Sequence, residues 1–343
     1  MKIAVLSPVA WRTPPRKYGP WEQVSSNITE GLVENGVDVT LFATADSITK
    51  GKMEFVCDHS YAEYPDVDPK VCECLHISNL MEQADKFDLI HNNFDFLPLT
   101  YSRLIRVPMV TTIHGFSSQK ILPVYKKYND TGYYVSISDS DRSPELDYVA
   151  TVYNGINTDE FTFCPEPDDY LLFFGRIHPE KGTYESIQIA KLSGRRLIIS
   201  GLIQDQAYFE SKIKPFVNDD DIVYVGNSGP KERDKLMGEA YALLHPISFE
   251  EPFGLSVAES MVCGTPVIAF SKGAMPELIL DSKTGFLVST LNDAVEAVNH
   301  ISSIDRKYCR DYAVSKFSRQ KMIEGYLAVY QDVLKIHNQK SDR

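Results

Sequence analysis

Residues 249–261 have the sequence FEEPFGLSVAESM, and the fold prediction starts from this stretch. Glu251 and Glu259 lie on either side of a Pro-Phe-Gly turn. An apolar, strand-like run at 241–246 precedes the turn, and a short helical pattern follows it and stops at Gly264. The order strand, acidic turn, helix places one carboxylate in a loop and the other within the helix.

This arrangement suits a particular kind of ligand. A helix that begins at Gly254 and Leu255 presents free backbone N–H groups and a partial positive charge, which favour a phosphate. The two flanking carboxylates can accept hydrogen bonds from sugar hydroxyls. The stretch therefore predicts a nucleoside-diphosphate sugar as ligand; the alternative is an ordinary helix start at which the dipole favours acidic residues.

The composition is that of an acidic globular chain. Its 343 residues suggest two domains, and 43% apolar with 24% charged residues is an ordinary balance. The formal charge of −12 argues against nucleic acid as the main partner, because binding phosphates requires a basic face. No apolar run approaches membrane-spanning length, so we expect no integral membrane segment, which leaves room for peripheral membrane contact.

The cysteines and the first residues predict a cytoplasmic protein. Residues 1–6 have a strand pattern and not that of a signal peptide. The six cysteines show no Cys-x-x-Cys spacing, and Cys72 and Cys74 are too close for a usual zinc pair. We expect six free thiols in a reducing compartment and no metal site.

Short apolar runs alternate with amphipathic stretches throughout the chain. In the first helical stretch, apolar residues recur at helical spacing from Trp21 to Leu32, and Gly36 ends it. Such alternation predicts parallel α/β sheets. Strands are expected at 3–6, 39–43, 89–91, 109–113 and 133–136, and again at 170–174, 196–200, 222–225, 242–244 and 266–269. Helices are expected at 20–35, 183–192, 231–240, 257–262 and 318–334.

A stretch rich in proline and acidic residues, 158–168, predicts a linker between two halves. We expect an N-terminal, acceptor-side Rossmann-like domain at 1–163 and a C-terminal, nucleotide-sugar-binding Rossmann-like domain at 164–317. In open parallel sheets ligands bind beyond the carboxyl ends of the strands, so two such domains are expected to face a central cleft. A transferase needs that geometry because closure excludes water.

A basic loop follows the predicted strand at 170–174. Arg176 and Lys181 precede the next helix, so both are expected at the carboxyl edge of the sheet, where they could neutralise a diphosphate leaving group. Alone, such a loop could be a solvated surface feature. The second predicted anion site at Gly254, on the same sheet edge, favours the functional interpretation.

The first half offers two further candidates. Gly19 ends a long loop and permits a phosphate to approach the backbone near the helix start; the alternative is a surface loop stiffened by prolines. His114 ends the predicted strand at 109–113 and is a candidate to hydrogen-bond the transferred sugar. The alternative is a structural histidine at the sheet edge.

Together these motifs resemble those of glycosyltransferase family 4, retaining enzymes of the two-domain GT-B fold. The resemblance covers nearly the whole chain and suggests a compact, soluble member. The motifs that carry it are YGPWE at 18–22, TIHG at 112–115, YNGI at 153–156, GR at 175–176 with KG at 181–182, EPFG at 251–254 through Glu259, CGTPVIA at 263–269, PE at 276–277 and KTGFLV at 283–288.

The resemblance implies a role for each candidate residue. Glu259 would bind the ribose hydroxyls of the donor, and Glu251 with the following backbone would hold the donor sugar. Arg176 and Lys181 would hold the diphosphate, with His114 beside the sugar. The predicted donor-binding residues are Gly19, Arg176, Lys181, Glu251, Phe253, Gly254, Leu255 and Glu259. The predicted catalytic residues are His114, Arg176, Lys181 and Glu251.

The resemblance has two further consequences. The C-terminal helix, about 318–343, would pack back on the N-terminal domain. The family usually has a second glycine after Gly19, where this chain has Pro20. Proline lacks an N–H group, which puts one phosphate or acceptor contact in doubt.

The leading hypothesis is a metal-independent, retaining glycosyltransferase, a hexosyltransferase that needs no cofactor. It would move a sugar from a UDP- or GDP-sugar to a hydroxyl of a saccharide or small-molecule acceptor. The alternatives are a nucleotide-sugar epimerase or hydrolase of the same fold, and a non-catalytic nucleotide-sugar binding protein.

Overall fold

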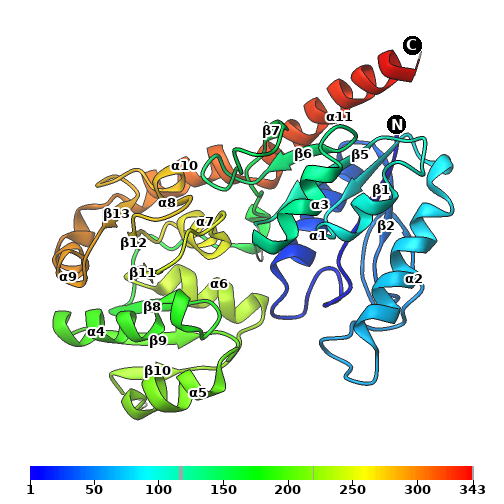
Figure 1. The fold of residues 1–343 in the computed structure, drawn as a ribbon. Coiled ribbons are helices and arrows are strands. Elements are labelled where there is room, and N and C mark those ends of the chain that lie inside the picture. The colour runs from blue at the N-terminus through cyan, green and yellow to red at the C-terminus, as the bar shows by residue number, and fades with distance from the viewer. Residues whose placement is uncertain (116–118, 219, 342–343) are drawn as a thin grey trace. The chain divides into compact units, whose positions relative to one another are not determined.

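The computed structural model describes residues 1–115, 119–218 and 220–341, and its contacts divide the chain into two compact α/β units (Figure 1). Unit 1 comprises Met1–Gly155 and Arg319–Arg343, and unit 2 comprises Ile156–Ser318. Each unit is built on one parallel sheet, which confirms the predicted fold class of two parallel-sheet α/β domains.

Unit 1 contains a seven-stranded sheet with the order β3-β2-β1-β4-β5-β6-β7, in which each strand is parallel to its neighbours. The strands are β1 (Lys2–Leu6), β2 (Asp38–Phe42), β3 (Lys52–Glu54), β4 (Leu89–Asn92), β5 (Met109–Ile113), β6 (Tyr133–Ser136) and β7 (Tyr148–Thr151). Its helices are α1 (Pro20–Glu34), α2 (Pro69–Met81), α3 (Leu122–Lys127) and α11 (Arg319–Ser341).

The start of helix α1 and its contact with α11 both depend on glycine residues. Pro20 occupies the first turn, where its missing N–H costs nothing, and the N-cap Gly19 has φ 149°, in the region that favours glycine. A Cβ on Gly31 would lie 2.5 Å from Cγ1 of Ile323 in α11. The two helices of unit 1 therefore approach closely at this glycine.

One prediction about the cysteines is wrong. Cys57 and Cys72 form a disulfide across a sequence separation of 15 residues, with their Cα atoms 6.1 Å apart. Cys72 lies on α2 and Cys57 in the loop before it, so folding brings together two thiols that the sequence spacing does not relate. Cys74, Cys164, Cys263 and Cys309 are free.

Unit 2 contains a six-stranded sheet with the order β10-β9-β8-β11-β12-β13, again with parallel neighbours. The strands are β8 (Tyr170–Phe174), β9 (Arg196–Ser200), β10 (Ile222–Tyr224), β11 (Ala242–His245), β12 (Val267–Phe270) and β13 (Gly285–Val288). The helices are α4 (Thr183–Ser193), α5 (Gln206–Tyr208), α6 (Pro230–Glu239), α7 (Leu255–Val262), α8 (Met275–Leu278), α9 (Leu291–His300) and α10 (Arg306–Phe317).

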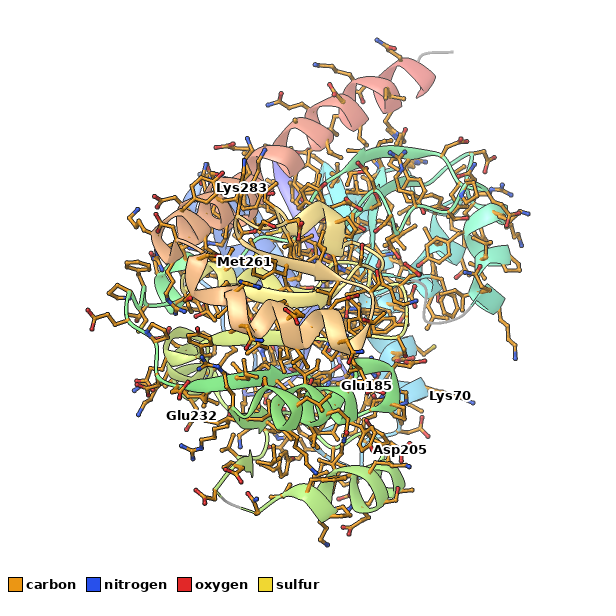
Figure 2. All side chains as sticks on the ribbon, turned by 90° about the vertical axis from the view of Figure 1, so that its left-hand side faces the viewer. Lys70, Glu185, Asp205, Glu232, Met261 and Lys283 are labelled. Carbon is orange, nitrogen blue, oxygen red and sulfur yellow. A yellow bond between two sulfur atoms is a disulfide. The ribbon has the colours of Figure 1, made fainter. Side chains whose placement is uncertain are left out.

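Helices α4 and α9 share one buried cluster with the strands of this sheet. Alternate strand residues such as Leu171 and Leu197 belong to one buried cluster with Ile187 of α4 and Val298 of α9. Helix α7 is buried from Val257 to Val262, including Met261, whereas Lys283 is exposed (both are labelled in Figure 2).

The stretch at 158–168 belongs to unit 2 and is held by contacts within it. Phe161 is buried, and the backbone N–H and hydroxyl of Thr162 donate to the carboxylate of Asp234 at 2.7 and 3.0 Å. In the part of the chain that the structure describes, no helix combines the length and apolar character needed to cross a membrane.

Candidate functional site

In unit 2 the strand order reverses between the neighbouring strands β8 and β11. Ligands of open α/β sheets bind at such a reversal, beyond the carboxyl ends of the strands. Arg176 and Lys181 follow β8, and Glu251 follows β11. A Cβ on Gly182 would lie 2.1 Å from the carbonyl oxygen of Pro246, so the loops after the two strands lie against each other.

Lys181 and Glu251 meet at this edge. The Lys181 Nζ donates to Oε2 of Glu251, and the two side chains are only 15% and 12% exposed. Nζ also lies 4.6 Å from the ring centroid of Phe249. Burial acts to raise the pKa of Glu251, but the charge of Lys181 and the hydrogen bonds from His245 and Lys181 outweigh it and lower the pKa to about 2. The carboxylate is therefore ionised at neutral pH and ready to accept hydrogen bonds.

His245, at the end of β11, is a third member of this group. Its Nε2 lies 3.5 Å from Oε2 of Glu251, and the residue is buried. Burial lowers the pKa of His245, with Glu251 opposing that shift and Lys181 adding to it. The imidazole is therefore uncharged at neutral pH and lies beside the buried Lys181–Glu251 pair.

Helix α7 begins next to this group. Its N-cap Gly254 has φ 96°, and a Cβ there would lie 2.7 Å from Cε of Met275. None of the described side chains caps the helix, which begins at Leu255. Phe253 is 2% exposed, with its ring 5.9 Å from that of Phe317, so only its backbone can face a ligand.

Glu259 lies inside α7 and is paired with a residue of α6. Nη1 of Arg233 donates to Oε1 of Glu259 at 3.0 Å, and the side chains are 12% and 7% exposed. Burial raises the pKa of Glu259, the charge of Arg233 opposes this, and the charge of Glu160 adds to it.

Arg176 does not join the Lys181–Glu251 pair. Its guanidinium donates to Oε1 of Gln204, in the segment that follows β9. The structure therefore brings Lys181 and Glu251 together and places Arg176 at the neighbouring strand end.

His114, in unit 1, belongs to a separate buried group. Its Nε2 lies 2.9 Å from Oδ1 of Asn93, which follows β4, and its ring stacks on Trp21 of α1 with centroids 5.7 Å apart. Burial lowers the pKa of His114 to about 3, so the ring is neutral. With Nε2–H donating to Asn93, Nδ1 carries the lone pair, and this buried atom has no hydrogen-bond partner in the described residues.

Gly19 lies beside a buried carboxylate. Oε1 of Glu22 accepts the backbone N–H of Trp11 at 3.0 Å, and a Cβ on Gly19 would lie 3.1 Å from Oε2. Burial raises the pKa of Glu22 to about 7, although two backbone N–H groups lower it. Glu22 fastens the loop before α1 to the first turn of that helix.

Four residues at these sites were not singled out from the sequence: Glu22, Asn93, Arg233 and His245. His245 ends the buried strand β11 and Asn93 follows the buried strand β4, and these places at strand ends could have identified them. Arg233 gave no such signal, because α6 carries several charged residues in succession and nothing in its spacing distinguishes one of them.

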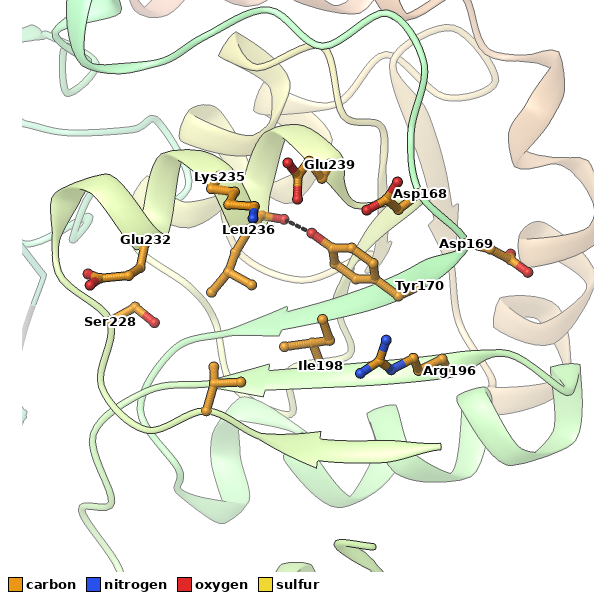
Figure 3. Close-up of a pocket in the computed structure, with 11 residues that line it drawn as sticks. Asp168, Asp169, Tyr170, Arg196, Ile198, Ser228, Glu232, Lys235, Leu236 and Glu239 are labelled. Carbon is orange, nitrogen blue, oxygen red and sulfur yellow. Dashed lines mark hydrogen bonds between the residues drawn. The ribbon is translucent and has the colours of Figure 1, made fainter. Parts of the chain in front are cut away.

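A separate groove of about 590 Å³ lies between α6 and strands β8 to β10 (Figure 3). Tyr170 crosses it, and its hydroxyl donates to the carbonyl of Leu236 at 2.8 Å. The groove is lined by none of the predicted site residues.

Aspartates with Asp-x-Asp spacing occur in unit 1, at Asp66 and Asp68 and at Asp139 and Asp141. Within the ranges that the structure describes, no group of three or more His, Cys, Asp or Glu side chains could hold a metal ion.

Comparisons with known proteins agree with this geometry. Residues 157–316 match the family model of glycosyl transferases group 1. The chain is 25% identical over 346 residues to an uncharacterized glycosyltransferase of Methanocaldococcus jannaschii, covering 85% of this chain and 86% of the relative. It is 30% identical over 169 residues to an uncharacterized 41.2 kDa protein of the Klebsiella pneumoniae cps region, covering 47% of this chain and about half, 46%, of that relative's length.

Solved structures show the same fold. AviGT4, a glycosyltransferase involved in avilamycin A biosynthesis, matches with a TM-score of 0.73 at 21% identity, covering 98% of both chains. Anabaena HepE, solved with UDP and glucose, matches with a TM-score of 0.74 at 18% identity, covering 96% of this chain and 99% of that one. The fold is that of GT-B glycosyltransferases, and the matched domain and the glycosyltransferase relatives support a transferase enzyme.

Proposed function

We propose that the protein is a retaining, metal-independent glycosyltransferase of family 4. It would move a sugar from a UDP- or GDP-sugar to a hydroxyl of a saccharide or small-molecule acceptor. The observation that carries the proposal is the buried Lys181–Glu251 pair beside the start of α7, with the buried Glu259 in the second turn of the same helix.

In this proposal each group of unit 2 has one part of the donor to hold. The α7 N-terminus, Lys181 and Arg176 supply positive charge to the diphosphate, which gains negative charge as it leaves. Glu251 accepts hydrogen bonds from the sugar, and Glu259 from the ribose. Because protein cations and a helix dipole supply this charge, no divalent metal is required. The UDP seen in HepE, a protein of the same fold, supports a nucleotide donor.

The proposed chemistry is a displacement on one face of the sugar. The bond from the anomeric carbon to the phosphate oxygen breaks while the acceptor oxygen forms a bond to that carbon from the same side. The departing phosphate takes the acceptor proton, so no side-chain nucleophile is needed. In unit 1, His114 would accept a hydrogen bond from a sugar hydroxyl at Nδ1.

A thermal-shift panel with UDP, GDP and ADP tests the donor assignment. One nucleotide should raise the melting temperature of the wild-type protein, because a ligand that binds only the folded state stabilises it. The same nucleotide should give a much smaller rise with Glu259→Gln. If no nucleoside diphosphate raises the melting temperature, the proposed donor site is wrong.

A further inference from the structure

Arg233 has a more restricted environment than an ordinary surface arginine. Besides the 3.0 Å bond to Glu259, its Nη2 lies 3.3 Å from Oε2 of Glu160, and its guanidinium lies 5.0 Å from the ring centroid of Phe161. Phe161 is 4% exposed. Two carboxylates and an aromatic face therefore hold the guanidinium in one place.

The pairing with Arg233 affects the protonation state of the buried Glu259 carboxylate. A buried carboxylate without a partner loses its hydration and tends to become protonated. A protonated acid has a donor hydrogen where the site needs an acceptor. Among the residues that the structure describes, the charged and titratable neighbours of Glu259 are Arg233 of α6, Glu160 of the short 3-10 turn Thr158–Glu160, and Cys263 just past α7. Burial raises the pKa of the Cys263 thiol, which stays neutral, so Arg233 is the neighbour that favours the ionised form.

We propose that Arg233 is a positioning residue for nucleotide recognition: it pairs with Oε1 of Glu259, keeps that carboxylate ionised and turns Oε2 toward the ribose diol of a nucleoside diphosphate. The inference rests on the proposed function, because it assumes that Glu259 receives the ribose. It assigns Arg233 no contact with the ligand itself.

The alternative is a purely structural ion pair that holds α6 against α7. The two roles differ in how the loss of Arg233 depends on the ligand. A structural role affects every ligand of unit 2 equally. A positioning role affects only ligands whose ribose hydroxyls reach Glu259.

The experiment compares two ligands on matched variants by calorimetry. The ligands are the best-binding nucleoside diphosphate of the UDP, GDP and ADP panel and its 2′,3′-dideoxy analogue. The variants are Arg233→Met, Arg233→Lys, Glu259→Gln, and the double variant of Arg233→Met with Glu259→Gln. Lys235→Met is the matched control, since it removes an exposed cation from the same helix.

Arg233→Met should weaken the ribonucleotide by roughly tenfold to a hundredfold, the range expected for a hydrogen bond to a charged group. The loss should grow from pH 8 to pH 6, because Glu259 without Arg233 takes up a proton more readily. Binding of the dideoxy analogue should stay within about twofold of wild type. Arg233→Lys should keep most of the wild-type affinity for the ribonucleotide, and Lys235→Met should leave the affinity for both ligands unchanged. In the double variant, Arg233→Met should not weaken binding beyond the loss that Glu259→Gln causes alone.

Equal weakening of both ligands by Arg233→Met, or weakening of neither, would overturn the inference. If Arg233→Met does not fold, the polar variant Arg233→Gln decides: a loss confined to the ribonucleotide supports the inference, and an equal loss for both ligands, or a loss for neither, contradicts it. Failure of the proposed function has a different signature, because Glu259→Gln would then leave both ligands at wild-type affinity whatever Arg233 does.

Discussion

Lys181 and Glu251 are 70 residues apart in the sequence and form a buried ion pair where the loops after β8 and β11 meet. A buried pair of this kind gives little net stability, since desolvation offsets most of the attraction. Removing one partner is costly, because it leaves the other charge buried without compensation. A buried pair at a strand-order reversal is therefore easier to explain by ligand binding than by stability.

Replacing Lys181 by methionine should lower kcat by about two to three orders of magnitude, because the leaving diphosphate loses one stabilising charge. Steady-state kinetics with saturating donor measures the effect. Lys283→Met, which removes an exposed lysine of the same unit, is the control and should be silent. A raised KM with unchanged kcat would mean that Lys181 binds donor and transition state equally, contrary to a leaving-group role.

The Lys181–Glu251 pair should also make the stability of the folded protein depend on pH in the acid range. The pKa of Glu251 falls from an ordinary 4.5 to about 2 in the folded protein, so its contribution is complete above about pH 4.5 and is lost as the pH falls toward 2. The difference in melting temperature between wild type and Glu251→Gln should be constant from pH 7 to 5 and should shrink below that. A difference that does not change down to pH 3 would show that Glu251 is not held ionised by its neighbours.

How far the sequence anticipated the fold depends on the element. The buried run of β8 (Tyr170–Phe174) matches its predicted range, because a strand covered on both faces favours a continuous apolar run. The short strand β3 (Lys52–Glu54) and the edge strand β7 (Tyr148–Thr151) were missed, since partly exposed edges carry little pattern. Helix α2 was missed for the same reason: it buries few residues.

The site could be anticipated only in its parts. Strand ends and the turn before α7 indicated which residues to examine, because those positions follow from local pattern. The contacts of Glu251 with Lys181 and of Glu259 with Arg233 depend on which strands are neighbours and how α6 lies against α7. Those relations are tertiary, and a single sequence does not contain them in readable form.

His114 should matter to turnover without setting its pH dependence. His114→Ala should lower kcat by roughly tenfold to a hundredfold, the loss expected for one buried hydrogen bond to the sugar. Since burial lowers its pKa to about 3, the ring is neutral throughout the working range. The pH–rate profiles of wild type and variant should therefore have the same shape from pH 5.5 to 8. An inflection near pH 6.5 that the variant lacks would contradict the neutral, buried ring; the exposed His300→Ala is the control.

The Cys57–Cys72 disulfide should stabilise unit 1. For a closed loop of this size, a sequence separation of 15, chain entropy suggests about 3 kcal/mol. Cys57→Ser with Cys72→Ser should lower the free energy of unfolding by an amount of that order in oxidising buffer, and reductant should have the same effect on wild type. Cys74→Ser, at an exposed free thiol, should change nothing. Free-thiol titration that finds all six cysteines reactive after denaturation without reductant would show that the bond is absent.

The most direct test of the central claim is proton NMR of the transfer product in excess EDTA, with the donor that the nucleotide panel selects. Turnover should persist in EDTA, and the anomeric coupling constant of the product should match that of the donor sugar, as same-face displacement requires. A product of inverted configuration would contradict the proposed mechanism, and activity that disappears in EDTA and returns with magnesium or manganese would contradict the assignment of the diphosphate charge to Lys181, Arg176 and the start of α7.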